Sequence, residues 1–268
     1  MGRLSVSAAW DESKVILARD GGLMGAVALA LIVLPQVILA VVGAPVGAEA
    51  TALTRAVYFA VLCLGFVGQI ALNRLAIGPS TTVKDAIAQG FARLLPVVAV
   101  IFVVFLAVAV VATILAMVLG SAGIVMMSKG GEPSPSLLLL LIVLLVVTFA
   151  VLQLVFPVAA AETGNPLRLA GRSWQLSRGN YWRLLGFVCS VFLGLGVVLL
   201  AVQLGVGSVV ALTLGAPKPG SVSALVNGLV SGVLQAGFTI LTATMLARMY
   251  LQLAGRGEAQ ASVPNSGI

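Results

Sequence analysis

Residues 133–161 read PSPSLLLLLIVLLVVTFAVLQLVFPVAAA and contain no charged side chain. A helix of about 20 apolar residues spans the hydrocarbon core of a bilayer, which is about 30 Å thick. Water-soluble domains carry about a quarter charged residues, whereas only 9% of this 268-residue chain is charged. The stretch therefore predicts a helix in lipid, and the composition predicts an integral membrane protein.

Five further stretches are long, apolar and uncharged, and none shows the alternation of polar and apolar residues that a membrane β-barrel needs. The sequence predicts an all-α polytopic membrane bundle in a single transmembrane domain over residues 1–254, followed by a disordered cytoplasmic tail over residues 255–268. The six expected spans lie at about residues 22–43, 55–74, 94–120, 136–160, 182–212 and 221–248.

Lysine and arginine are distributed unevenly among the connections between these spans. Twelve of the 15 fall in the two terminal segments and in alternate connections, and only Arg55, Lys129 and Lys218 fall in the others. Because basic residues are retained on the cytoplasmic side of a membrane, the distribution predicts that both chain ends face the cytoplasm. The expected location is the bacterial cytoplasmic (inner) membrane.

Short amphipathic helices are expected at the membrane interface before the first, third and fifth spans. The first covers residues 5–19 and ends at Gly21-Gly22; the second begins at the cap Thr82; the third begins at Asn165 and stops at Gly179. These helices are either topological anchors or a surface that recognises a lipid or a partner. The candidate contacts with lipid headgroups are Trp10, Arg168, Arg172, Trp174, Arg178, Trp182 and Arg183. Whether the three units of one interfacial helix and two spans are true repeats stays open.

The segment FPVAAAETGNPLRLAGRSWQLSRGNYWRLLG, residues 156–186, resembles a bacterial family typified by the membrane domain of glycerophosphoryl diester phosphodiesterases. The residues that carry the likeness are Pro157, Glu162, Pro166, Ser173, Trp174, Leu176, Gly179, Trp182 and Arg183, together with the early segment SAAWDESKVILARDGGL. The resemblance implies a six-helix inner-membrane protein. It does not imply the phosphodiesterase activity, since no part of the chain is left for the catalytic domain.

No group suited to catalysis stands out within the expected spans. The chain has no histidine, and all eight carboxylates lie outside the apolar cores; a membrane-embedded enzyme needs such groups there. We therefore expect no enzyme activity, no cofactor and no metal site. The net charge of +7 is spread along the chain, so nucleic acid is not an expected partner.

Uncharged polar residues do occur inside the expected spans. In the last span Ser223, Asn227, Ser231, Gln235 and Thr239 repeat every fourth residue beside Gly228 and Gly232. Single amides occur elsewhere at Gln36, Gln69, Gln153 and Gln203, the first and third of them close to prolines. Small residues and amides commonly pack helices together in membranes, and converging amides can also line a path for a solute. Candidate residues for either role are Gln36, Gln203, Asn227, Gly228, Gly232 and Gln235.

Two hypotheses follow from these features. The first is a non-catalytic accessory or membrane-organising protein that contacts anionic lipid headgroups through its basic interfacial helices. The alternative is a channel or carrier for a small neutral or weakly polar solute. A membrane-protein partner and a homo-oligomer both remain open.

Overall fold

The computed structural model describes residues 4–43, 51–78, 82–124 and 134–261. All elements within these ranges are helical. The first half contains α1 (Val6–Ala28), the π-helical turn η1 (Leu29–Val33), α2 (Leu34–Val42), α3 (Ala52–Ile77) and α4 (Val83–Ser121). The second half contains α5 (Pro135–Leu152), α6 (Val155–Ala161), α7 (Pro166–Ser177), α8 (Tyr181–Leu214) and α9 (Val222–Ala261).

The predicted all-helical class is confirmed, and five helices in the described ranges are long and apolar enough to cross a membrane. They are Val6–Val42, which joins α1, η1 and α2, then α3, α4, α8, and α9 up to Gly255. The fourth predicted span, residues 136–160, is not one helix, because α5 and α6 are separate elements. The chain thus has the character of a multi-pass membrane protein.

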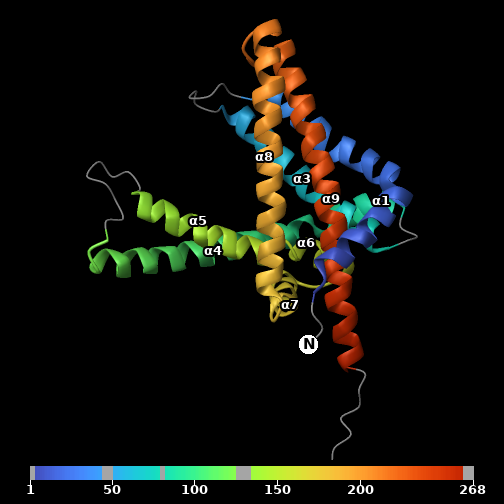
Figure 1. The fold of residues 1–268 in the computed structure, drawn as a ribbon, viewed down its shortest axis with the longest axis vertical. Coiled ribbons are helices and arrows are strands. Elements are labelled where there is room, and N and C mark those ends of the chain that lie inside the picture. The colour runs from blue at the N-terminus through green and yellow to red at the C-terminus, as the bar shows by residue number, and fades with distance from the viewer. Residues whose placement is uncertain (1–3, 44–50, 79–81, 125–133, 262–268) are drawn as a thin grey trace, which may run out of the picture.

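Helix α9 occupies the centre of the arrangement. It packs against α1, η1, α2, α3 and α8, and α3 also packs against α4 and α6. Figure 1 shows α8 and α9 upright, while α4 and α5 run together to one side, across the direction of α8. Most large side chains of α4, α5 and α8 are exposed and apolar, as expected for surfaces in contact with lipid.

The first expected interfacial helix is not a separate element. α1 runs from Val6 to Ala28 straight through Gly21 and Gly22, so the prediction that these glycines end a helix at about residue 19 was wrong. Each glycine weakens a helix by only about 1 kcal/mol. The residues Ala9, Ser13, Ile16 and Met24 on both sides of the pair are buried, and this packing holds the helix together.

The second and third expected interfacial helices behave differently from each other. The second is the beginning of the continuous helix α4, and its predicted cap is present, since Oγ1 of Thr82 accepts a hydrogen bond of 3.1 Å from the backbone N–H of Asp85. The third is the separate helix α7, capped by Asn165, whose Oδ1 accepts from the N–H of Arg168 at 3.0 Å. Gly179 follows α7 with φ of +86°, a conformation that favours glycine.

A break between α5 and α6 divides the fourth predicted span. Gln153 and Leu154 form a turn between Leu152 and Val155. Pro157 explains the break, because proline lacks the N–H that would bond to the carbonyl of Gln153, and its ring clashes with that carbonyl in a straight helix.

The C-terminal helix is longer than predicted. α9 continues to Ala261, seven residues into the segment expected to be a disordered tail, whereas residues 262–268 of that tail lie outside the described residues. The sequence at 258–261, EAQA, consists of good helix formers, which accounts for the extension past Gly255 and Gly257.

Candidate functional site

A cavity of about 440 Å³ lies where η1, α2, α3, α8, α9 and the break between α5 and α6 meet. Its polar lining consists of Gln36, Tyr58, Gln69, Gln153, Gln235, Thr239 and Thr242. The rest of the lining is apolar, and no charged side chain belongs to it. Cavities of this size, with a few polar groups in an apolar wall, are typical sites for small molecules.

Gln153 is the most enclosed amide of this cavity. Its residue is 7% exposed, and its side chain forms no hydrogen bond with any residue that the structure describes. Buried amides in proteins are nearly always hydrogen-bonded. The turn caused by Pro157 therefore places an amide with unused donors and acceptors at the wall of the cavity.

A π-helical turn within the first long helix also borders the cavity, beside Gln36. Pro35 cannot donate to the carbonyl of Leu31, and the chain adopts the π-helical turn η1 just before it, with the N–H of Leu34 bonded to the carbonyl of Leu29. Single π-helical turns inside α-helices are frequent at functional sites. Both prolines near amides thus produce helix irregularities that border the same cavity.

A second cavity of about 430 Å³ adjoins the first and shares Gln36, Leu39 and Tyr58 with it. It is also lined by Gln203, Asn227 and Ser231, and by the turn between α8 and α9 at Lys218. The Nε2 of Gln203 donates to Oγ of Ser231 at 2.5 Å. The lining of the two cavities extends along α9 from Ala224 to Thr242, a distance of about 27 Å at 1.5 Å per residue.

Two glycines of α9 allow close contact with α2 and η1. A Cβ atom on Gly228 would lie 2.6 Å from the Cβ of Ala40, and one on Gly232 would lie 3.2 Å from the Cα of Val33. Only glycine permits the two backbones to approach so closely. This contact brings the amides of α2 and α9 to the same cavities.

The candidate residues of α9, together with Gln36 and Gln203, are distributed over the two cavities and the contact with η1. Gln36, Gln203, Asn227 and Gly228 line the second cavity, Gln36 and Gln235 line the first, and Gly232 packs against η1. The sequence did not single out the aromatic part of the first cavity, which consists of Tyr58, Phe66, Phe149, Phe156, Phe192 and Phe238. Asn73 lies outside both linings and donates to the carbonyl of Gln69 at 2.8 Å.

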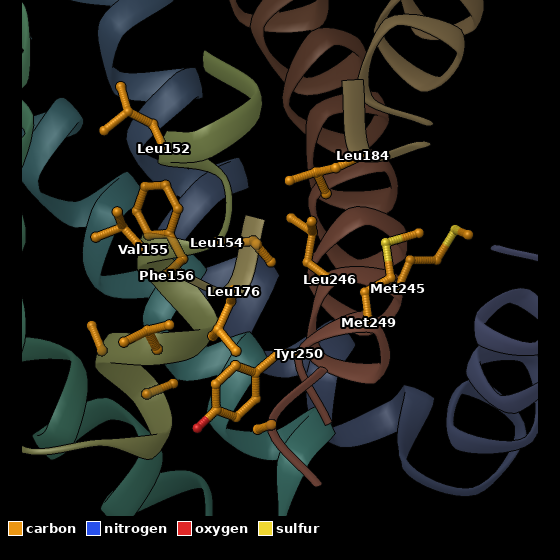
Figure 2. Close-up of a cluster of buried hydrophobic side chains, with 14 of the residues drawn as sticks. Leu152, Leu154, Val155, Phe156, Leu176, Leu184, Met245, Leu246, Met249 and Tyr250 are labelled. Carbon is orange, nitrogen blue, oxygen red and sulfur yellow. The ribbon is translucent and has the colours of Figure 1, made fainter. Parts of the chain in front are cut away.

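A buried apolar cluster lies next to the first cavity, beyond Thr242 along α9. Figure 2 shows Leu154, Leu184, Leu246 and Met249 among its members, drawn from the α5–α6 break, α8 and α9. Phe156 belongs both to this cluster and to the cavity wall. The two cavities therefore lie along α9 between the α8–α9 turn and this cluster.

The candidate headgroup contacts gather around α7, apart from Trp10 on α1, which is 43% exposed. Trp174 and Trp182 are 56% and 80% exposed, and Arg168 and Arg178 are also exposed. Two arginines of the set take part in internal contacts. Nε of Arg172 donates to Oε1 of Glu162 at 3.0 Å, and Nη1 of Arg183 donates to the carbonyl of Leu4 at 2.9 Å.

The N-terminal segment is hydrogen-bonded to residues close to α7 and to α9. The N–H of Leu4 donates to Oδ1 of Asn180 at 3.0 Å, and that of Ser5 donates to Oε1 of Gln252 at 3.2 Å. Asn180 therefore binds the N-terminal segment rather than capping α8 with its side chain. The contacts place the beginning of the chain beside the last turns of α9.

Comparison with known families matches residues 5–253 to the family described as a domain of unknown function, DUF7847. The chain belongs to the DUF7847 family. No curated protein and no solved structure matches the chain. For this DUF7847 member, the resemblance to membrane domains of glycerophosphoryl diester phosphodiesterases stays a prediction.

Proposed function

We propose that the chain is a non-catalytic inner-membrane protein that binds and carries a small neutral or weakly polar molecule in the amide-lined cavity. The observation that carries this proposal is the side-chain amide of Gln153, which lines the cavity and has no hydrogen-bond partner among the described residues. Its oxygen and its NH2 group are therefore available to a molecule in the cavity.

The lining supports a neutral ligand. Each glutamine offers one acceptor oxygen and an NH2 group with two hydrogens, so Gln36, Gln69, Gln153 and Gln235 can bind hydroxyl, carbonyl or amide groups. The lining of the first cavity includes no charged side chain that could offset the desolvation of an ion. Uncharged molecules with a few polar groups fit this chemistry.

The helix irregularities support carriage rather than static binding. Transporters commonly place their sites at discontinuous helices, and here the break between α5 and α6 borders the cavity, as does the π-helical turn η1 within a continuous helix. We place the basic end with α7 in the cytoplasm, in accordance with the arginine distribution. The α8–α9 turn beside the second cavity would then lie toward the outer face, and the apolar cluster would lie toward the cytoplasm.

Chemical labelling in membranes tests the site. In a chain carrying Cys63→Ser and Cys189→Ser, a cysteine is introduced by Gln153→Cys or Thr239→Cys and exposed to N-ethylmaleimide, itself a small neutral molecule. Both thiols are expected to react. The matched control is Val97→Cys, at a position of α4 that is 0% exposed and outside the cavity lining. Reaction at Gln153→Cys and Thr239→Cys no faster than at this control would contradict the proposal.

A second role is favoured by one specific observation, the exposure of Trp174 and Trp182 beside the exposed Arg168 and Arg178. Tryptophan and arginine on a short helix, as Trp174 and Arg168 are on α7, suit the headgroup layer of an anionic membrane. We infer that α7 contacts lipid headgroups. In a chain with Trp10→Phe and Trp182→Phe, lipids brominated near the headgroup should quench Trp174 fluorescence more than lipids brominated near the chain ends; the reverse order would contradict this role.

A further inference from the structure

We infer that the ligand is an uncharged aromatic molecule dissolved in the lipid phase, which reaches the first cavity sideways from the membrane. This inference rests on the proposed function and narrows its ligand class. Five of the 10 phenylalanines of the chain line this one cavity. They come from α3, α5, α6, α8 and α9, so five separate elements each direct an aromatic ring to the same space.

The rings are arranged for contact with another ring. Phe149 and Phe192 meet edge to face with centroids 4.8 Å apart and an interplanar angle of 79°. Phe192 and Phe238 continue the series at 5.2 Å and 77°. Aromatic side chains favour such tilted contacts because the positive edge of one ring meets the negative face of the next. A ligand ring could extend this series, whereas a saturated ring lacks the required charge distribution.

Burial of apolar surface does not by itself account for the phenylalanines. Within a membrane the surrounding acyl chains are as apolar as the side chains, so an apolar wall gives little attraction for an apolar ligand. Selection among lipid-dissolved molecules then depends on directional contacts. The aromatic wall and the amides of Gln69, Gln153 and Gln235 together provide a ring contact and a hydrogen bond in one cavity.

Part of the cavity wall is exposed at the apolar surface of α3 and α8. Tyr58 and Leu62 of α3 are 47% and 53% exposed, and Phe192 of α8 is 37% exposed, although all three line the cavity. Both helices are apolar enough to cross a membrane. A molecule in the bilayer can therefore reach the cavity between α3 and α8 without passing through water.

Photolabelling with 4-hydroxybenzophenone in proteoliposomes tests the inference, because this uncharged aromatic ketone is its own crosslinking reagent. We expect the label in residues 58–69, 149–156 or 235–242. We compare benzhydrol with dicyclohexylmethanol as competitors, since the two share one skeleton and one hydroxyl and differ in aromaticity. Benzhydrol is expected to displace the label at about a tenfold lower concentration, corresponding to one or two favourable ring contacts.

The outcomes separate the inference from the function on which it rests. Label in the cavity that both competitors displace equally would overturn the aromatic class and leave a neutral ligand in place. Label confined to the exposed side chains of α4, with N-ethylmaleimide still reacting at Gln153→Cys, would likewise overturn the inference alone. If that thiol also fails to react, both proposals fail. A Phe192→Leu variant, which keeps an apolar side chain at the cavity wall, is expected to lose the preference for benzhydrol while keeping the label.

Discussion

The phenol of Tyr250 on α9 donates a hydrogen bond of 2.9 Å to Oε1 of Glu162, the residue that directly follows α6. The same oxygen accepts from Nε of Arg172 on α7 at 3.0 Å. Tyr250 is 5% exposed, whereas the Glu162 side chain is 28% exposed, so the contact is partly buried. It joins the long central helix to the α6–α7 connection.

Replacement of this phenol is expected to weaken the contact between α9 and the α6–α7 connection. Tyr250→Phe removes a hydrogen bond to a charged group and should lower the free energy of unfolding by about 1.5–3 kcal/mol. The midpoint of thermal unfolding in detergent measures the effect. Tyr181→Phe is the control, because the Tyr181 hydroxyl donates to the carbonyl of Val147 in an exposed setting. An equal fall of the thermal midpoint in both variants would show that the contact with Glu162 stabilises the fold no more than the exposed hydrogen bond of Tyr181 does.

The close contact of Gly228 on α9 with Ala40 on α2 gives a second prediction. Gly228→Ala places a Cβ 2.6 Å from that of Ala40, and overpacking of this kind typically destabilises by about 1–3 kcal/mol. Gly237→Ala on the same helix meets nothing within 4 Å, and alanine favours a helix over glycine by about 0.5–1 kcal/mol. We expect the thermal midpoint to fall for Gly228→Ala and to hold or rise for Gly237→Ala. A midpoint unchanged by Gly228→Ala would contradict the close approach of the two helices.

The break after α5 gives a third prediction. Pro157→Ala restores an N–H four residues after Gln153, so α5 and α6 can join and turn the Gln153 side chain away from the cavity. N-ethylmaleimide should then react several-fold more slowly with a cysteine at position 153. Pro96→Ala serves as the control, since Pro96 lies inside the uninterrupted helix α4. Slowing by both substitutions alike would refute the role assigned to Pro157.

Helix positions could be predicted from the sequence, because long uncharged stretches have few alternatives. α8 spans Tyr181–Leu214, close to the predicted 182–212, and the caps Thr82 and Asn165 both act as expected. The predicted helix boundaries were wrong at two places, where tertiary packing or a proline outweighed the local sequence pattern. Gly21 and Gly22 stay helical within α1, while the effect of Pro157 on Gln153 outweighed the continuous apolar pattern around it.

The cavity could be predicted only in part. The amides of Gln36, Gln69, Gln153, Gln203 and Gln235 were visible in the sequence as unusual residues for lipid. Their convergence depends on the rotation of each helix about its own axis, which the Gly228 and Gly232 contacts set for α9. The phenylalanines gave no signal, because aromatic residues in apolar stretches are as common on lipid-facing surfaces as in cavities.

Thermal unfolding of Gln153→Leu in detergent tests most directly whether the Gln153 amide serves a ligand or the fold. Leucine fills a similar volume and removes an amide that has no partner among the described residues, so we predict a midpoint equal to or higher than that of the unaltered protein. Gln203→Leu breaks the bond to Ser231 and should unfold at a lower temperature. A midpoint for Gln153→Leu below that of Gln203→Leu would show that the amide supports the fold, and would contradict the proposed site.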